Sequence, residues 1–303
     1  MPPSVPAVPG PWPGGALDRA GGERDGDGLL DGLRAAPDTR VLVIHGDAAP
    51  VSERGLLLVP VSDVAAAREW AFLGRAADGA GLLLAVVDEE RDAAVPAQAQ
   101  RAPLRAIGGD LSADEAEILG TAVALAGWLR DAAFCPACGA RTLLRQAGWS
   151  RHCPRCGREH FPRTDPAVIV LVSSADDPDR VLLGANAAWG GSRYSCFAGF
   201  AEAGESLEDT VVREVGEEAG VRLDAIEYRG SQVWPYPRSL MLGFRARAIR
   251  DDDARADGEE IVEVRWFDRA EIGAALRGET ALKLPGAASI AHRLIDDWYR
   301  ERA

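Results

Sequence analysis

Short apolar runs separated by turn residues mark the first part of the chain. Runs at 41–44, 56–59 and 82–87 alternate with Gly, Asp and Pro, a pattern typical of short strands joined by turns. We therefore expect a small β-rich domain within residues 38–130. Residues 1–37 are rich in Pro, Gly and Asp and show little periodicity, which predicts a loosely ordered leader.

A helix over 112–130 is predicted to close this N-terminal domain. Ser112 begins it, and Glu115 follows three residues later, the spacing of a capping box. Ile118, Leu119 and Val123 then continue the apolar spacing of a helix.

The second half of the chain alternates between strand and helix patterns. A β-branched run at 166–174 and an apolar run at 180–185 predict a hairpin. The remaining elements are strands at 192–200, 225–234, 240–249 and 261–267, and an amphipathic helix at 287–301. Mixed strands with a helix on each side predict an α+β chain in which residues 162–303 form an α/β/α sandwich with a mixed sheet.

The most informative helix lies in residues 199–221, GFAEAGESLEDTVVREVGEEAGV. Ser206 is a typical N-cap residue, and Gly220 ends the helix. At about 100° per residue, one apolar stripe is formed by Leu207, Val211, Val215 and Ala219. Glu214 and Glu218 are one turn apart at the edge of that stripe.

The Glu214–Glu218 pair predicts a metal site. Two carboxylates at the rim of a packing face repel each other and are costly to desolvate unless a cation lies between them. Mg²⁺ or Mn²⁺ suits such oxygen ligands and commonly takes substrate phosphate as a further ligand. A solvated acidic face would explain the pair alone, but not its fixed spacing from Gly199, Glu205 and Arg213.

Composition limits the class of protein. With 303 residues, 47% hydrophobic and 27% charged, the chain resembles soluble proteins of two or three domains. It has no apolar run of about 18 residues, and its N-terminus lacks the basic and apolar segments of a secretory signal. We therefore expect a cytoplasmic protein with no membrane partner. The net charge of −13 disfavours broad electrostatic binding to nucleic acid.

Four of the five cysteines form two Cys-x2-Cys pairs. Cys135 and Cys138 precede Cys153 and Cys156 by 14 intervening residues, and each pair is followed by Gly. This spacing predicts a zinc ribbon over 131–161, with one structural Zn²⁺ per chain held by four thiolates. His152 and His160 are not needed as ligands. Cys196 has no partner at such spacing and is expected to be a core residue.

The motif in 199–221 resembles the signature of the Nudix hydrolases, Gly-x5-Glu-x7-Arg-Glu-apolar-x-Glu-Glu-x-Gly-apolar, and every fixed position matches. That family hydrolyses nucleoside diphosphates linked to another group, and its helix glutamates carry divalent cations. The resemblance implies catalytic roles for Glu205, Arg213, Glu214, Glu217 and Glu218. Arg213 is expected to orient the glutamates by ion pairing.

Residues 231–239, Ser-Gln-Val-Trp-Pro-Tyr-Pro-Arg-Ser, resemble one branch of that family. The NADH pyrophosphatases also have a zinc ribbon before the Nudix domain, and they carry Ser-Gln-Pro-Trp-Pro-Phe-Pro-x-Ser at this place. The chain departs at Val233 and at Tyr236, where the aromatic ring is kept. The resemblance includes PRTDPAVIV at 162–170 and extends over about residues 130–300.

This resemblance to the branch implies the remaining metal ligands. The backbone carbonyl of Ala198 and the carboxylate of Glu260 would join Glu214 and Glu218 around Mg²⁺ or Mn²⁺. The sequence leaves open whether Glu259 or Glu260 is the further ligand, and which glutamate is the general base.

The same resemblance implies the substrate contacts. Phe161 and Phe200 would flank the nicotinamide, and Ala291 would be a further contact. The substrate loop would comprise Gln232, Val233, Trp234, Pro235, Tyr236, Pro237, Arg238 and Ser239. The related enzymes are homodimers in which an aromatic at the position of Phe161 closes the partner's pocket, so a homodimer is expected.

The leading hypothesis is an NAD(H) diphosphatase that yields nicotinamide mononucleotide and AMP, and that cleaves a 5′-NAD cap from RNA in the same way. One alternative is a Nudix hydrolase of other dinucleotides, such as ADP-ribose or diadenosine polyphosphates. Another is a nucleic-acid-binding zinc ribbon with a silent Nudix domain. The complete set of glutamates argues against a catalytically inactive Nudix domain. A role in RNA binding stays open because of a basic cluster formed by Arg141, Arg145, Arg151, Arg155 and Arg158.

Overall fold

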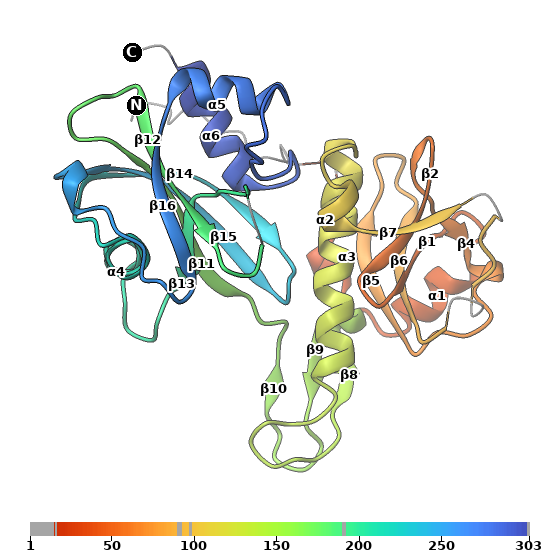
Figure 1. The fold of residues 1–303 in the computed structure, drawn as a ribbon. Helices are drawn as coiled ribbons and strands as arrows, with labels where there is room; N and C mark the ends of the chain where they lie inside the picture. Colours follow the sequence, from red (N-terminus) through yellow and green to blue (C-terminus); the bar gives the residue numbers. More distant parts are fainter. Residues whose placement is uncertain (1–14, 16, 90–92, 97–98, 190–191, 302–303) are drawn as a thin grey trace, which may run out of the picture. The chain divides into compact units, whose positions relative to one another are not determined.

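The computed structural model of the chain describes residues 15, 17–89, 93–96, 99–189 and 192–301 (Figure 1). They form two compact units. The N-terminal unit holds the described residues up to 164 together with 235–238, and the C-terminal unit holds 165–234 and 239–301. No helix among these residues is both long and apolar enough to cross a bilayer. Residues 1–14 and 16 of the predicted leader lie outside the described residues.

A seven-stranded sheet is the base of the N-terminal unit. Its strands are β1 (Arg40–His45), β2 (Ala48–Ser52), β3 (Gly55–Leu56), β4 (Val59–Pro60), β5 (Glu69–Arg75), β6 (Gly81–Val87) and β7 (Gln100–Pro103). β1 and β6 pair in parallel at its centre. Both are buried on both faces, which explains why the runs at 41–44 and 82–87 are apolar at every position. The predicted β-rich domain is confirmed, although the run at 56–59 divides between β3 and β4.

Helix α3 (Ala113–Asp131) packs on one face of this sheet, after the short helix α2 (Leu104–Ile107). The hydroxyl of Ser112 accepts a hydrogen bond from the backbone N–H of Glu115. In return, the carboxylate of Glu115 accepts a hydrogen bond from the backbone N–H of Ser112 at 3.1 Å. Leu119 and Leu125 join the buried strand side chains in one cluster. The helix predicted over 112–130 and its capping box are both confirmed.

Helix α1 (Leu29–Ala35) differs from the prediction, because it lies within residues 1–37. Leu33 is buried against the sheet face opposite α3, and Glu23 forms an ion pair of 2.6 Å with Arg75 of β5. Leu29 and Leu30 precede Leu33 by one turn and also pack against this cluster, so the segment has a short apolar helix stripe that the Gly- and Asp-rich composition obscured.

The four paired cysteines come together beside a small sheet of β8 (Leu143–Arg145), β9 (Ser150–His152) and β10 (Glu159–His160). Their Sγ atoms all lie within 4.8 Å of one another. Cys135 to Cys156 is 3.7 Å and Cys138 to Cys153 is 3.5 Å, close to the spacing of about 3.8 Å between thiolates on tetrahedral zinc. The backbone N–H groups of Cys156 and Arg155 lower the pKa of the Cys153 thiol to about 6, whereas its hydrogen bond with Cys138 raises the pKa of that partner thiol to about 11.

A six-stranded mixed sheet is the base of the C-terminal unit, and it confirms the predicted mixed sheet. Its strands are β11 (Asp165–Ser173), β12 (Arg180–Asn186), β13 (Phe197–Phe200), β14 (Leu223–Trp234), β15 (Ser239–Ala248) and β16 (Ile261–Asp268). Only β11 and β15 pair in parallel, and β11 and β12 form the predicted hairpin. β13 is shorter than the strand predicted at 192–200, because Ser195 only bridges Gly184.

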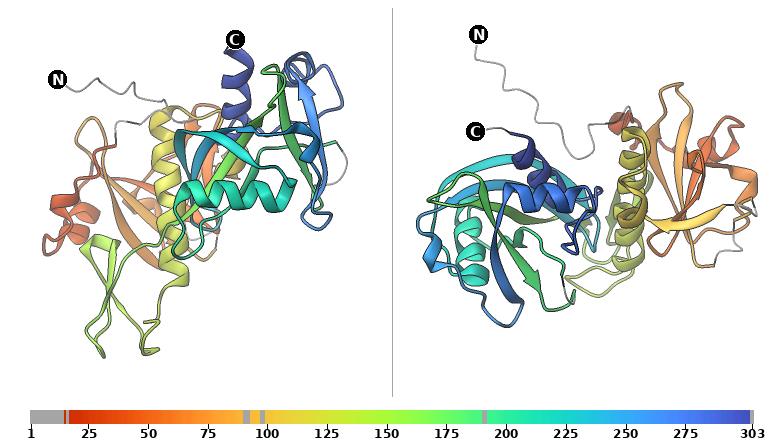
Figure 2. Two further views of the ribbon diagram at one scale, coloured as in Figure 1. Left: turned by 90° about the vertical axis from the view of Figure 1, so that its left-hand side faces the viewer. Right: turned by 45° about the horizontal axis from the view of Figure 1, so that its top comes forward.

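Helices cover both faces of this sheet. Val168, Val170 and Val172 of β11 pack with α4 (Leu207–Ala219). The alternate residues Ile169 and Leu171 pack with α6 (Ile290–Arg300). Figure 1 shows α4 on one side of the strands and α6 on the other, with α5 (Arg269–Leu276) beside α6; the turned views of Figure 2 agree. The predicted α/β/α sandwich is confirmed.

Helix α5 was not predicted. Asp268 and Glu271 form a capping box at its start, but Ile272 and Gly273 are its only buried residues among the eight. With so little buried surface, its sequence shows no clear apolar periodicity.

The cysteine cluster leads to a prediction about zinc. The freshly purified protein should contain about one tightly held zinc per chain, because the four thiolates form a closed shell. Cys153→Ser should lower both the zinc content and the melting temperature, whereas Cys196→Ser should keep the zinc. Elemental analysis and thermal unfolding check this. Protein that was never exposed to chelator and yet lacks zinc would contradict the assignment.

Candidate active site

Helix α4 presents the carboxylates of the motif. Ser206 caps it by accepting the backbone N–H of Asp209 at 3.1 Å, and Gly220 ends it at a φ of 69°, which favours glycine. The predicted stripe packs into the sheet, with Val211, Val215 and Ala219 buried. The local sequence thus fixes the face on which the glutamates lie.

Glu214 and Glu218 lie against β13, as expected for the rim of a packing face. A Cβ atom on Gly199 would be 1.9 Å from Oε1 of Glu214, so only glycine lets this carboxylate lie so close to the strand. The backbone N–H of Ala198 donates to Oε2 of Glu218 at 3.3 Å. Two predicted ligand residues, Ala198 and Glu218, are therefore adjacent.

Glu218 is a buried carboxyl in an acidic environment. Its exposed fraction is 6%. Burial raises its pKa to about 8, assisted by the charges of Glu260, Glu214 and Asp257, while the N–H of Ala198 opposes the shift. Burial also raises the pKa of Glu214. Such a site is costly to ionise without a cation, which is the condition that a divalent metal would satisfy.

Arg213 organises the outer side of the site. Its guanidinium donates to Glu205 at 2.6 and 2.9 Å, to Glu214 at 2.9 Å and to Glu217 at 3.0 Å. It also donates to the backbone carbonyl of Phe200 at 2.9 Å. The hydrogen bond from Arg213 holds the pKa of Glu205 at about 2. Arg213 therefore ion-pairs with three glutamates, the arrangement that the sequence predicted.

Glu259 and Glu260 differ in their contacts. The charge of Glu260 raises the pKa of both Glu218 and Glu214, and its carboxylate accepts a hydrogen bond from the side-chain amide of Asn186 at 3.2 Å. The backbone N–H groups of Glu259 and Glu260 both donate to Asp257, at 2.5 and 2.9 Å. Glu260 is thus the better candidate for the further ligand.

Asp257 is a further acidic neighbour of Glu218 that the sequence did not single out. Its carboxylate accepts N–H groups of the turn before β16, and its charge also raises the pKa of Glu218. The signal was the segment Asp-Gly-Glu-Glu at 257–260, since Asp before Gly commonly hydrogen-bonds its own turn.

Gln232 and Ala291 lie where β14 meets the start of α6. Gln232 is buried, and its amide donates to the carbonyl of Ala288 and accepts the N–H of Ile290, both at 2.7 Å. Both ends of its amide are thus used to hold the helix. Ala291 is 3% exposed and belongs to the core cluster. Cys196 lies in the same cluster, and burial raises its pKa to about 12, so the predicted core role is confirmed.

The rest of the predicted substrate loop divides between the two units. Pro235, Tyr236, Pro237 and Arg238 group with the N-terminal unit. The hydroxyl of Tyr236 accepts the backbone N–H of Arg105 at 3.1 Å, and the guanidinium of Arg105 is 5.0 Å from its ring centroid. Tyr236 therefore adds an anchor that phenylalanine would lack. In the C-terminal unit, Trp234 is partly buried, Val233 is exposed and Ser239 is buried.

Three predicted features of the surface remain to be placed. Phe161 in the N-terminal unit and Phe200 in the C-terminal unit are each 51% exposed, as stacking groups must be. Arg151 is only 2% exposed and donates to Glu69 and to the carbonyl of Leu129. It is therefore a structural residue rather than part of a basic surface, and the other four arginines of that cluster are exposed.

Comparison with known families identifies these parts. Three family models match in succession: an NADH pyrophosphatase-like rudimentary NUDIX domain at 24–128, an NADH pyrophosphatase zinc ribbon domain at 130–161 and a NUDIX domain at 163–285. Curated relatives named NAD-capped RNA hydrolase NudC, from Mycobacterium bovis and Mycobacterium tuberculosis, are 38% identical over 296 residues, covering 95% of this chain and 87% of theirs. One from Pseudomonas aeruginosa is 39% identical over 204 residues, covering 67% of this chain and 68% of its own.

The chain belongs to the Nudix hydrolase family. The match at 130–161 also shows that the four cysteines form a structural zinc site. The match at 24–128 explains the N-terminal sheet as a rudimentary Nudix domain. In this Nudix hydrolase, the complete acidic cluster lies in the domain at 163–285.

The pKa of Glu218 leads to a prediction for protein that holds zinc but no other divalent cation. Since its folded pKa of about 8 exceeds the usual 4.5, its stabilising contribution is full below about pH 4.5 and is lost as pH rises through about 8. Glu218→Gln removes this loss. The melting temperature of the variant should therefore exceed that of the wild type at pH 8.5, and the gain should shrink toward pH 5.

The control is Glu208→Gln, which changes an exposed glutamate of the same helix. It should shift the melting temperature equally little at every pH. A Glu218→Gln variant with no pH-dependent gain would mean that the carboxyl is not buried in an acidic environment.

Proposed function

We propose that the protein hydrolyses the pyrophosphate of NAD(H) to nicotinamide mononucleotide and AMP, and removes 5′-NAD caps from RNA. The observation that carries this is the match to NAD-capped RNA hydrolases along 95% of the chain. The match is supported by the succession of a rudimentary domain, a zinc ribbon and a Nudix domain.

We further propose that Mg²⁺ or Mn²⁺ acts at the acidic cluster. The donors fit a hard cation, because Glu214, Glu218 and Glu260 supply carboxylate oxygens and the backbone carbonyl of Ala198 lies on the adjacent strand. A bound divalent cation would neutralise the pyrophosphate and lower the pKa of a water molecule. The pKa of Glu218, already raised by burial, explains why this set favours a cation over an empty, ionised state.

The protein groups have separate tasks in this proposal. Arg213 holds Glu205, Glu214 and Glu217 in fixed positions, so the carboxylates need little reorganisation during the reaction. Glu217 has the most exposed carboxylate of the three, at 63% of its side chain, and is accessible to a water that attacks phosphorus. Phe200, whose carbonyl binds Arg213, would place its exposed ring beside the substrate.

The central experiment is product analysis on NADH, NAD⁺, ADP-ribose and NAD-capped RNA, with Mg²⁺ and with Mn²⁺. Nicotinamide mononucleotide and AMP should form from NAD(H), and capped RNA should yield a 5′-monophosphate end. Glu218→Gln should lower turnover by about three orders of magnitude or more, while Glu208→Gln keeps it. Equal turnover of ADP-ribose and NADH would favour a general dinucleotide hydrolase, and undiminished turnover by Glu218→Gln would refute the assigned metal helix.

We also propose a homodimer in which Phe161 of one subunit completes the nicotinamide pocket of the other. The exposed ring of Phe161 supports this, because it leaves a stacking face uncovered. Phe161→Ala should raise KM for NADH several-fold more than for ADP-ribose, since a stacking plate contributes about 1 kcal/mol.

Mixing Glu218→Gln subunits with Phe161→Ala subunits should restore pockets that hold both wild-type groups. A monomer in sedimentation, or no recovery by subunits shown to exchange, would overturn the shared pocket and leave the hydrolase assignment intact.

A further inference from the structure

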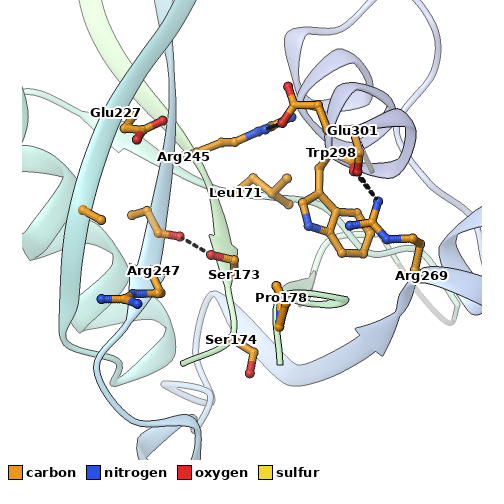
Figure 3. A pocket seen from close by; sticks show the side chains of 12 residues that line it. Leu171, Ser173, Ser174, Pro178, Glu227, Arg245, Arg247, Arg269, Trp298 and Glu301 are labelled. Carbon is orange, nitrogen blue, oxygen red and sulfur yellow. Dashed lines mark hydrogen bonds and ion pairs between the residues drawn. The ribbon is translucent and has the colours of Figure 1, made fainter. Parts of the chain in front are cut away.

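A pocket lies in the C-terminal unit, away from the acidic cluster. Figure 3 shows it between the sheet and the end of α6, at the carboxyl ends of the parallel strands β11 and β15. Its volume is about 510 Å³, and its lining includes Arg245, Arg247, Arg269, Trp298 and Glu301. Nothing in the proposed hydrolysis uses these side chains.

The strand register separates this pocket from the active site. Arg245 of β15 lies opposite Leu171 of β11 and Glu227 of β14. Leu171 faces α6, whereas α4 with its glutamates covers the other face of the sheet. On the α6 side, Gln232 of the predicted substrate loop lies opposite Met241 of β15. Met241 is four residues before Arg245, a separation of about 13 Å along the strand.

Arg245 is incompletely paired. Only 15% of its side chain is exposed, and its Nη1 donates to the carboxylate of Glu301. Its Nε and Nη2 are buried and have no hydrogen-bond partner among the described residues. Nε and Nη2 form the edge of the guanidinium that binds a carboxylate or phosphate through two parallel bonds. Leaving that edge unpaired is costly, so an oxyanion there would be stabilising.

The other two arginines of the pocket are already engaged. Arg247 donates to both carboxylate oxygens of Asp224 at 2.9 Å. Arg269 donates to Asp179 at 2.6 Å and to the carbonyls of Tyr299 and Glu301 at the end of α6. These two arginines thus build the walls, and Arg245 provides the buried donors that lack an acceptor.

The site already holds one carboxylate of the chain itself. The carboxylate of Glu301 lies between Arg229, at 2.7 Å, and Arg245. The two guanidinium groups are therefore arranged to bind an anion. Because 53% of the Glu301 side chain is exposed, its displacement by a ligand would return the carboxylate to water at little cost.

We propose that this pocket binds a small molecule through a phosphate or carboxylate group, which takes the Nε–Nη2 edge of Arg245 and displaces the carboxylate of Glu301. The proposal goes beyond the hydrolase function and does not depend on it. The shared chemistry is an oxyanion, and direct titration distinguishes its two sources.

The test is calorimetric titration of the full chain with inorganic phosphate and, separately, with acetate, in buffer without Mg²⁺ or Mn²⁺. We expect saturable binding with Kd of about 1–10 mM. The anion that binds more tightly identifies the ligand group. Arg245→Lys should weaken binding at least about tenfold, because lysine keeps the charge but loses the two-donor edge.

Two further variants make the result specific. Arg247→Lys is the matched control, because it changes an arginine of the same pocket whose donors are already engaged, and it should leave Kd within about twofold. Glu301→Gln should tighten binding several-fold by removing the competing charge. This variant keeps Arg245, so it decides the question even if Arg245→Lys is unstable. Binding that neither variant alters, or no saturable binding by wild type and Glu301→Gln, would overturn the proposal.

Discussion

The contact between the carboxylates of α4 and strand β13 is the constraint on which the rest of this fold depends. Glu218 is buried beside other acidic groups, a position in which its ionised form is costly without a cation beside it. That position requires Gly199 next to Glu214, the Ala198 N–H next to Glu218, and Arg213 to balance the outer glutamates. The apolar stripe of α4 holds the helix to the sheet, and these few contacts determine where its acidic edge lies.

Elements with a strong local signal could be predicted from the sequence. The hairpin of β11 and β12, the strands β14 to β16 and the helices α3, α4 and α6 all have clear periodicity, caps or glycine stops. Helices α1 and α5 bury few side chains of their own. In α1 the spacing of Leu29, Leu30 and Leu33 is that of a short apolar helix face, but the Gly- and Asp-rich composition around it obscured it. Helix α5 is positioned by contacts such as that of Arg269 with the end of α6.

The site shows the same division. The spacing of the motif was sufficient to find Arg213 and the glutamates, because one helix carries most of them. Asp257 escaped notice because it is distant in sequence from Glu218, whose pKa its charge helps to raise. The burial of Arg151 also could not be predicted from the sequence, because its partners Glu69 and Leu129 are far away along the chain. The spacing of a motif predicts functional residues that lie within one helix or strand, whereas contacts between residues of different elements can be seen only in the folded structure.

The loop after β14 shows how one short segment can serve packing and recognition together. Side chains of a strand alternate between faces, so buried Gln232 holds the start of α6 while its neighbour Val233 is exposed. Three residues further, Tyr236 accepts a hydrogen bond from the backbone N–H of Arg105 with its hydroxyl. A change from phenylalanine to tyrosine therefore gains a hydrogen bond to the rudimentary Nudix domain at 24–128. That domain carries none of the carboxylates of the motif, and this hydrogen bond links it to Tyr236 of the predicted substrate loop.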